Sequence, residues 1–398
     1  MVSTASATGR TATGRGGIRH EVVAALAVTT TIGYGVLYYA FGALLEPMRA
    51  ELNISATTAT GALTLAALTA AVLSIPVGRW LDRRGGHGLM TTGSIIAAGA
   101  VLAWSRVDNA GQLYVVFVAI GIASAMVLYP PAFAVIVATT APARRTTALL
   151  AVTLVAGFAS SIFIPLTGQL IHAYGWRQTL VVLACIVAVG TIPLHALAIR
   201  RTGPAAAASR AHESRQALPG FWLLATAFVL HSAALAVIGV HVVTYLTRLG
   251  HRPTTAATLA GLLGLLSVTG RITVTILRRR LPMTAISAAI ISMQGIALAL
   301  LPAAGRSTVG AAACLTAFGL GFGVASIAKP AIILDRYGDQ GYATIAGILG
   351  TPVSIAGATA PLAAAAMAAA LGYTPLILTA AGGCLLAGLA LYRLHVRA

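Results

Sequence analysis

The sequence predicts an all-α membrane protein whose twelve transmembrane helices form two pseudo-symmetric six-helix bundles. Three observations predict this class. Of the 398 residues, 58% are hydrophobic and only 9% are charged, whereas a soluble domain carries about 25% charged residues. The mean hydropathy is +0.90, and apolar runs of roughly 20 residues, each able to cross a bilayer, recur along the chain. A weak internal repeat relates the two halves.

Twelve apolar runs follow one another, separated by short polar segments. We expect them to begin near Glu21, Thr57, Gly86, Gly111, Arg144, Gly175, Pro219, Pro253, Leu281, Ser307, Gly341 and Tyr373. Residues 1–19 are interpreted as a disordered cytoplasmic tail, although a mitochondrial transit peptide shares their acid-free, arginine-containing composition. Residues 20–200 and 219–398 then form the two six-helix bundles, and the polar residues 201–218 form a cytoplasmic linker.

The internal repeat supports this division. Pro165 precedes the segment GWRQTLVVL at residues 175–183, and Pro361 precedes GYTPLILTA at residues 372–380. Both segments fall at the fifth and sixth spans of their half. Repeats of this kind, with substrate bound between them near the bilayer midplane, are typical of transporters.

The distribution of basic residues predicts the orientation. If the N-terminus is cytoplasmic, the inside segments hold 18 basic residues and the outside segments hold six. The positive-inside rule therefore places both termini in the cytoplasm, with the protein in the cell membrane. The net charge of +18 has the same origin and favours contact with anionic lipid. No basic cluster carries the interleaved aromatic residues of a nucleic-acid site, so no nucleic-acid partner is expected.

Cofactor, metal and catalytic chemistry are not indicated. The three cysteines, Cys185, Cys314 and Cys384, fall in separate predicted spans, far from any metal-ligand spacing. Only eight acidic residues are present, and no phosphate-binding glycine loop or Ser-His-Asp order occurs. We expect no cofactor, no metal and no enzymatic activity.

Two basic residues lie inside apolar runs with no acid at comparable depth. Arg271 lies in the run 254–277 and Lys329 in the run 307–334. A charge in hydrocarbon is costly, so such residues indicate function, and two positive charges facing one cavity would suit an anionic substrate. Either side chain could instead extend to the nearby cytoplasmic headgroups, and Lys329 could pair with Asp335.

Histidine and tyrosine side chains complete the predicted site. His231 and His241 share a face of the seventh span, because ten residues at about 100° each leave them about 80° apart. Histidine titrates near physiological pH, so either could carry a coupled proton, or serve only in packing. Tyr34 and Tyr38 in the first span and Tyr129 in the fourth could present hydroxyls to a substrate, or lie at helix interfaces.

The loop between the second and third spans, GRWLDRRGG at residues 78–86, resembles the signature loop of the major facilitator superfamily. The resemblance covers roughly residues 20–396. It implies that Gly78, Asp82 and Arg83 form a conformational latch, in which the aspartate caps a helix N-terminus in the opposite half. A carboxylate is favourable at that end of the helix dipole.

Further segments resemble the monocarboxylate and oxalate/formate carriers of this superfamily: GYGVLYYAFGALLEPM in the first span, GWR at residues 175–177 and Gly270-Arg271 in the eighth span. In that branch the eighth-span arginine binds the substrate carboxylate, which implies this role for Arg271. One departure stands against it, because Ser267 occupies a position where monocarboxylate carriers often have aspartate. The fourth-span arginine motif of proton-linked drug exporters is missing, which counts against a drug exporter.

The sequence therefore predicts a secondary transporter that moves a small, monocarboxylate-like organic anion by alternating access. We expect it to act as a monomer, and its span histidines are compatible with proton symport. The alternative is a proton-antiport exporter of drugs or other small amphiphiles, which Gly157, Pro165 and Gly168 in the fifth span favour. A membrane sensor is disfavoured because no segment outside the spans is large enough for a signalling domain.

Reporter fusions test this topology. Reporters within residues 201–218 and at both termini are expected to report the cytoplasm, and reporters near Arg106 and Arg248 the outside. A single reporter on the wrong side would contradict the order of the twelve spans.

Overall fold

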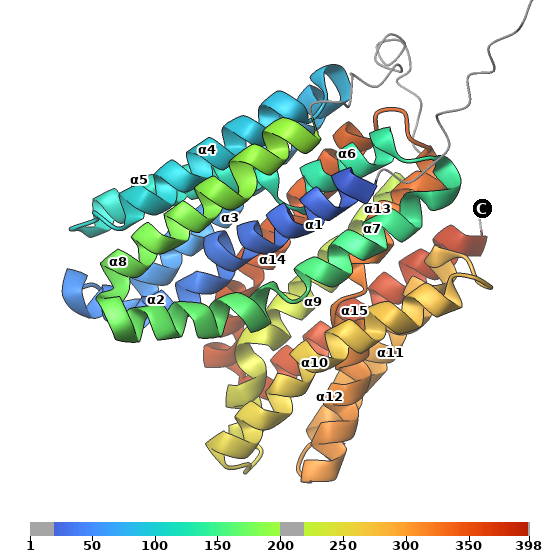
Figure 1. Cartoon of the computed structure of the whole chain (residues 1–398). Coiled ribbons are helices and arrows are strands. Elements are labelled where there is room, and N and C mark those ends of the chain that lie inside the picture. The colour runs from blue at the N-terminus through green and yellow to red at the C-terminus, as the bar shows by residue number, and fades with distance from the viewer. Residues whose placement is uncertain (1–19, 200–218, 397–398) are drawn as a thin grey trace, which may run out of the picture.

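The structure, a computed structural model, describes residues 20–199 and 219–396, apart from the side chains of residues 253, 257, 264, 265 and 268. Every regular element in these ranges is a helix (Figure 1). The predicted tail, residues 1–19, and the predicted linker, residues 201–218, lie outside the described residues. The helices are α1 (His20–Tyr34), the π-helix η1 (Gly35–Tyr39), α2 (Ala40–Leu52), α3 (Ala56–Arg84), α4 (His87–Trp104), α5 (Ala110–Val127), α6 (Tyr129–Thr139), α7 (Pro142–Ala156), α8 (Ala159–Ala198), α9 (Phe221–Arg248), α10 (Pro253–Leu277), α11 (Met283–Ala304), α12 (Thr308–Phe322), α13 (Ala325–Tyr337), α14 (Tyr342–Leu371) and α15 (Tyr373–Val396).

These helices build twelve spans. Nine helical segments of the described chain are long and apolar enough to cross a membrane, and the α12–α13 pair, bent by 41°, adds a tenth. One of the nine, Pro142–Ala198, reverses direction at Gly175 and so contains two spans. The twelfth span is α10. Each span begins within two residues of the predicted position, which confirms the predicted fold class.

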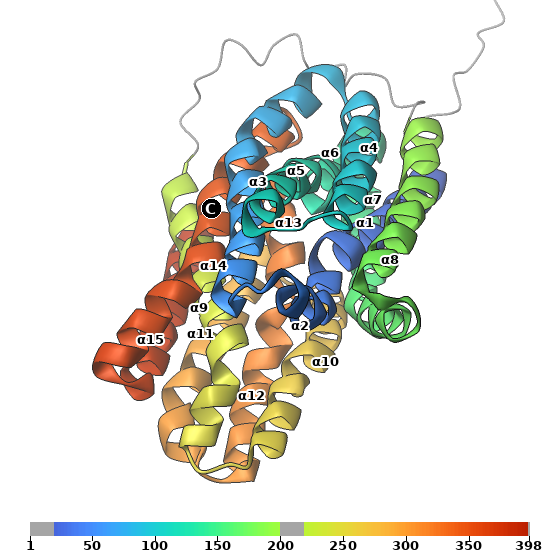
Figure 2. The same ribbon diagram turned by 90° about the vertical axis from the view of Figure 1, so that its left-hand side faces the viewer.

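The first six spans and the last six form separate bundles that lie side by side (Figures 1 and 2). We call the end of the molecule at which α1 begins and α15 ends the terminal face, and the other end the opposite face. The helix ends of the two bundles lie close together at the terminal face and are spread apart at the opposite face.

The internal repeat has a direct counterpart in the backbone. The turn between the fifth and sixth spans is made by Gly175 (φ 76°, ψ 167°), and the turn between the last two spans by Gly372 (φ 87°, ψ 174°). Residues with a Cβ rarely adopt these angles. The fourth and tenth spans are also both broken, at Leu128 and at Gly323.

Three helix starts at the opposite face have side-chain N-caps. Ser55, Asn109 and Ser307 each accept a hydrogen bond from the backbone N–H three residues later, at 3.0 Å. Such caps satisfy donors that a helix leaves free at its N-terminus.

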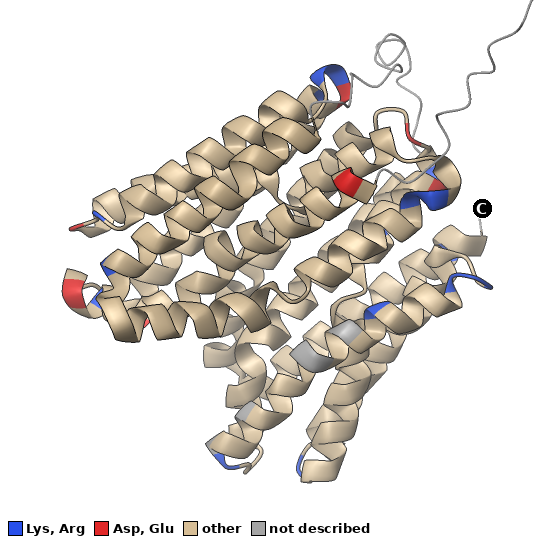
Figure 3. Ribbon diagram, in the orientation of Figure 1, with Lys and Arg blue, Asp and Glu red and all other residues tan. Residues whose placement is uncertain are grey.

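Charged residues are concentrated at the ends of the helices, and the ribbon between them is almost free of charge (Figure 3). Large apolar side chains are exposed on the outer surface of the bundles, as Val115 (72%), Val189 (76%) and Val309 (80%) illustrate. An apolar outer belt between charged ends matches a bilayer, and identifies the protein as a multi-pass membrane protein.

Asp82, at the end of α3, caps α14 of the opposite bundle. Its carboxylate oxygens accept hydrogen bonds from the backbone N–H groups of Ala343 (3.2 Å) and Thr344 (2.8 Å), and from the Thr344 hydroxyl (2.6 Å). The contact therefore combines charge-assisted hydrogen bonds with the favourable end of the helix dipole. Arg83 is exposed, and none of its described contacts reaches the other bundle.

The α3 and α14 backbones approach each other closely along the same seam. A Cβ on Gly78 would collide with the carbonyl of Ala343, and a Cβ on Gly347 would collide with the carbonyl of Ser74. Farther along, the Thr351 hydroxyl donates to the carbonyl of Ala71 at 2.9 Å. Small residues on both helices thus allow the contact that the Asp82 cap completes.

A second ion pair joins the bundles at the terminal face. Arg145, near the start of α7, pairs with Asp339, before α14, at 2.7 Å. The sequence analysis did not identify this pair. Among the described residues, every polar contact between the bundles lies in the half nearer the terminal face, so this conformation is closed there.

Replacing Asp82 with Asn should favour the conformation that is open at the terminal face. The lost charge weakens the cap by about 1–2 kcal/mol, a roughly five- to thirtyfold change in the ratio of the two conformations. The measurement is labelling of a cysteine placed at Ser354 in a cysteine-free background, with an impermeant maleimide added from each side. The matched control is Asp108→Asn, because Asp108 pairs with Arg177 inside one bundle at the opposite face. An unchanged labelling ratio in Asp82→Asn would remove the latch role.

Candidate functional site

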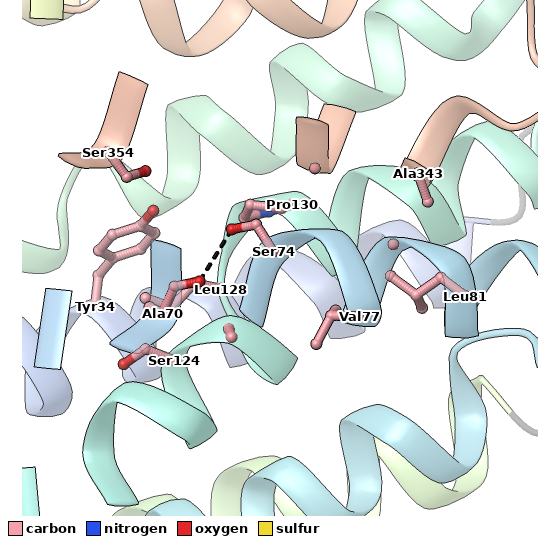
Figure 4. A pocket seen from close by; sticks show the side chains of 13 residues that line it. Tyr34, Ala70, Ser74, Val77, Leu81, Ser124, Leu128, Pro130, Ala343 and Ser354 are labelled. Atoms are coloured by element: carbon pink, nitrogen blue, oxygen red, sulfur yellow. Dashed lines mark hydrogen bonds between the residues drawn. The ribbon is translucent and has the colours of Figure 1, made fainter. Parts of the chain in front are cut away.

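Two adjoining cavities lie between the bundles. The larger, which we call the central cavity, has a volume of about 260 Å³ and is lined by parts of α1, α3, α6, α9, α13 and α14. The smaller, of about 150 Å³, shares Tyr34, Ser74, Pro130 and Ser354 with it and continues along α3 to Gly78 (Figure 4). The hydroxyl end of Tyr34 points toward Ser354. Residues of both halves therefore line one continuous region next to the latch.

Irregular helix segments supply much of the polar lining. Tyr34 directly precedes the π-helix η1, and Tyr129 directly follows the break at Leu128. Ser326 and Lys329 follow the break at Gly323. Broken helices and π-segments often occur at binding sites, because they turn side chains and backbone groups toward a cavity.

Lys329 lies on α13 and lines the central cavity. The predicted alternative of a pair with Asp335 is not found, because Asp335 accepts two hydrogen bonds from Arg278, at 3.0 and 3.2 Å. Within the described part of the chain, Lys329 has no hydrogen-bond or ion-pair partner, and no acidic residue lines either cavity. Lys329 thus lines a cavity in which no described residue supplies a counter-charge.

Arg271, which the sequence predicts to bind the substrate, does not line either cavity in this conformation. Its Nη1 donates to the carbonyl of Thr153 on α7 at 3.1 Å, and its Nε lies 3.4 Å from the carbonyl of Gly323. A Cβ on Gly157 would collide with Nη1, and one on Gly323 would lie 2.6 Å from Nε. The guanidinium therefore bridges the two bundles in a socket formed by two glycines.

Arg271 nevertheless borders the central cavity. The Gly323 carbonyl that it approaches also accepts a hydrogen bond from the hydroxyl of Ser326 at 2.7 Å, and Ser326 lines the cavity. Because the guanidinium is bonded inside the protein, Arg271 does not extend to the headgroups in this conformation.

His231 lines the central cavity and is 1% exposed. Its Nε2 lies 2.8 Å from Oε1 of Gln294 on α11. Its Nδ1 is buried and has no hydrogen-bond partner among the described residues. Gln294 itself is fully buried and was not identified from the sequence.

Two other histidines of the spans, His241 and His195, have structural partners. His241 donates through Nε2 to the carbonyl of Pro361 at 3.1 Å and packs edge-on against Tyr373. It does not line either cavity. His195, which the sequence analysis also missed, is bonded through both ring nitrogens, to Ser94 at 2.7 Å and to Thr29 at 2.9 Å.

Two of the three predicted tyrosines line the central cavity, and the third does not. Tyr34 and Tyr129 both line the central cavity, and their ring centroids lie 4.6 Å apart across α1 and α6. Tyr38 is 52% exposed and packs against Tyr39 instead. Within the described residues, no group of three or more His, Cys, Asp or Glu side chains could hold a metal ion.

The comparisons with known proteins agree with this architecture. The family model of the Major Facilitator Superfamily matches residues 26–351. No individual curated protein matches the sequence significantly.

Three solved structures illustrate the similarity. The human organic anion transporter MFSD10 gives a TM-score of 0.72 at 15% identity, covering 94% of this chain and 99% of that chain. The E. coli fucose:proton symporter gives 0.74 at 17%, covering 93% and 98%. A bacterial homologue of the iron transporter ferroportin, in an outward-facing state, gives 0.75 at 17%, covering 96% and 100%. At these identities the likeness shows the fold alone, whereas the family model covers most of the sequence. This multi-pass membrane protein belongs to the major facilitator superfamily.

Proposed function

We propose that this secondary transporter carries a small, monocarboxylate-like organic anion across the cell membrane by alternating access. The observation that carries the proposal is Lys329, a basic side chain in the cavity between the bundles with no acidic partner among the described residues. An uncompensated charge in a site of low dielectric is costly. An anionic substrate bound beside Lys329 would remove that cost, and would gain a charge-assisted hydrogen bond.

The rest of the lining suits such a substrate. Hydroxyl groups of Tyr34, Tyr129 and Ser354 offer further hydrogen-bond donors. Apolar side chains, including Phe133, Phe228, Leu235 and Ile333, form the remaining wall and suit a short hydrocarbon body. The volume of about 260 Å³ lies just below the range of drug-sized ligand pockets, about 300–1,000 Å³. The human organic anion transporter MFSD10, which is among the similar structures, shows that this fold can carry an organic anion.

The proposed orientation makes the terminal face cytoplasmic. Basic residues outnumber acidic ones there, in agreement with the positive-inside rule. The conformation described is then closed to the cytoplasm, and the substrate would enter the cavity from outside. We propose that Arg271 acts at the next step: when the bundles part at the terminal face, it leaves the Thr153 carbonyl and becomes free to bind the substrate carboxylate.

The second candidate function is export of small amphiphiles by proton antiport. The observation in its favour is the aromatic and aliphatic part of the cavity wall, which would bind the apolar part of an amphiphile whether its polar group is anionic or cationic. The two functions differ in their dependence on Lys329, because a cationic amphiphile would bind better without it.

Replacing Lys329 with Gln should lower uptake of labelled monocarboxylates into proteoliposomes at least tenfold, and Lys329→Arg should retain part of it. Gln keeps a hydrogen-bond donor but removes the charge that offsets the carboxylate. The assay is initial uptake of a panel of short monocarboxylates and dicarboxylates, normalised to inserted protein. Arg279→Gln is the matched control, because Arg279 is an exposed base outside the cavity. Anion uptake at the wild-type rate in Lys329→Gln would contradict the proposal, and enhanced uptake of a cationic amphiphile would favour the exporter.

Replacing Arg271 with Lys should lower transport about tenfold without loss of inserted protein. One ammonium group cannot reproduce the guanidinium fork that reaches both the Thr153 and the Gly323 carbonyls. Gly157→Ala should act in the same direction without any change in charge, since its Cβ would collide with Nη1. Gly168→Ala is the control, because a Cβ there meets nothing within 4 Å. Wild-type transport rates in both Arg271→Lys and Gly157→Ala would show that transport requires neither the guanidinium group nor the glycine socket around it.

A further inference from the structure

The hydrogen-bonding chain of His231 defines which of its nitrogens is free. The carbonyl of Phe318 can only accept, so the Gln294 nitrogen donates to it, at 2.8 Å. The Gln294 amide oxygen must then face His231, at 2.8 Å from Nε2. Because an amide oxygen is only an acceptor, Nε2 of His231 carries a hydrogen. In the neutral ring, Nδ1 therefore holds an unshared lone pair.

The surrounding packing holds this arrangement in place. Any Cβ on Gly321 would collide with the amide group of Gln294, so that glycine keeps open the space that the amide fills. Gln294 is fully buried between α11 and α12, and α9 presents His231 from the other side. The tautomer of His231 is thus set by groups that cannot exchange their roles.

The lone pair of Nδ1 has no described partner, although the nitrogen is buried. A buried polar atom without a partner is unusual and calls for an explanation. Two other span histidines differ: both nitrogens of His195 are bonded, and His241 donates to the carbonyl of Pro361 away from the cavities. Among these three, only His231 combines a free nitrogen with a place in the central cavity.

We propose that Nδ1 of His231 is the proton-binding atom of this transporter, that proton and anion binding are coupled through the central cavity, and that Gln294 is the positioning residue. This inference rests on the proposed function, because the coupling requires an anion beside Lys329. A proton from water on the open side binds the Nδ1 lone pair and gives an imidazolium ring. Nε2–H remains bonded to Gln294 in both protonation states.

Electrostatics gives the direction of the coupling. A protonated His231 and Lys329 are like charges lining one cavity, so each disfavours the other until an anion binds. The anion therefore raises the proton affinity of His231, and by linkage the proton raises the anion affinity by the same factor. Proton and anion are then bound together, which corresponds to symport.

No described neighbour competes for this role. The titratable groups that line the cavity are Lys329 on α13, Tyr342 on α14, Tyr34 on α1 and Tyr129 on α6. Among the remaining helices packed on α9, α12 buries Cys314 and α15 buries Cys384 in the same core. Arg271 on α10 is directed to backbone carbonyls. None of these groups is a carboxylate that could take the proton near neutral pH.

The test separates exchange from net uptake in proteoliposomes. Exchange of labelled for unlabelled monocarboxylate requires the anion site alone, whereas accumulation driven by a pH gradient, alkaline inside, requires the proton site as well. In His231→Gln we expect accumulation to fall at least tenfold, whereas exchange continues at saturating substrate and only its half-saturation concentration rises, because the proton no longer strengthens anion binding. His241→Gln, the same change on the same helix but away from the cavities, should keep both activities.

Two further measurements test the mechanism directly. Addition of a transported monocarboxylate to the purified wild-type protein in weak buffer should cause proton uptake, which His231→Gln should abolish. Gln294→Ala frees the ring from its fixed tautomer and should shift the pH midpoint of accumulation while exchange continues.

The proposal is overturned if His231→Gln still accumulates substrate, if wild-type protein takes up no proton on binding, or if folded His231→Gln loses exchange together with accumulation. A wild-type protein that exchanges no monocarboxylate at all would instead refute the proposed function.

Discussion

Hydrocarbon supplies no counter-charge, and every ionised group within the spans must find its partner in the protein or in a ligand. The described acids of this chain lie at or near the ends of helices, where Asp82, Asp335 and Asp339 are bonded to other groups. The intramembrane bases are therefore left with two different solutions. Arg271 bonds to backbone carbonyls of both bundles, and Lys329 faces the central cavity without a described partner. The proposed substrate class follows from the second solution.

Two of the contacts between the bundles share one design. Small residues let backbones approach, as at Gly78 and Gly347, and a polar group then uses the exposed end or side of the partner helix. The Asp82 cap and the Arg271 bridge are both of this kind. In each, a charged side chain bonds to backbone groups and not to an opposite charge, so that its release breaks no ion pair. Such contacts are strong enough to favour one conformation and weak enough, at a few kcal/mol each, to be exchanged during a transport cycle.

Three histidines in the spans differ in how their ring nitrogens are hydrogen-bonded. His195 has both nitrogens bonded, His241 donates to a carbonyl, and His231, which lines the cavity, has one buried nitrogen without a described partner. Chemically the three side chains are the same. Their different environments favour a packing role for the first two and the proposed proton binding for the third, and the difference arises from the neighbours that each helix brings.

The sequence by itself determined the class, the number and the order of the spans, because an apolar run long enough to cross a bilayer is a local property. It also located Asp82 and Lys329, since a motif and an intramembrane charge are visible in one dimension. Only the tertiary structure decided which side chains share a cavity. Gln294 meets His231 across 63 residues, and a neutral amide in an apolar run carries no signal of its own. Likewise Arg271 and Lys329 look equivalent in sequence. The rotation of α10 and α13 against the other bundle places Arg271 in a glycine socket and Lys329 in the cavity lining. That rotation depends on packing between distant spans, which hydropathy does not encode.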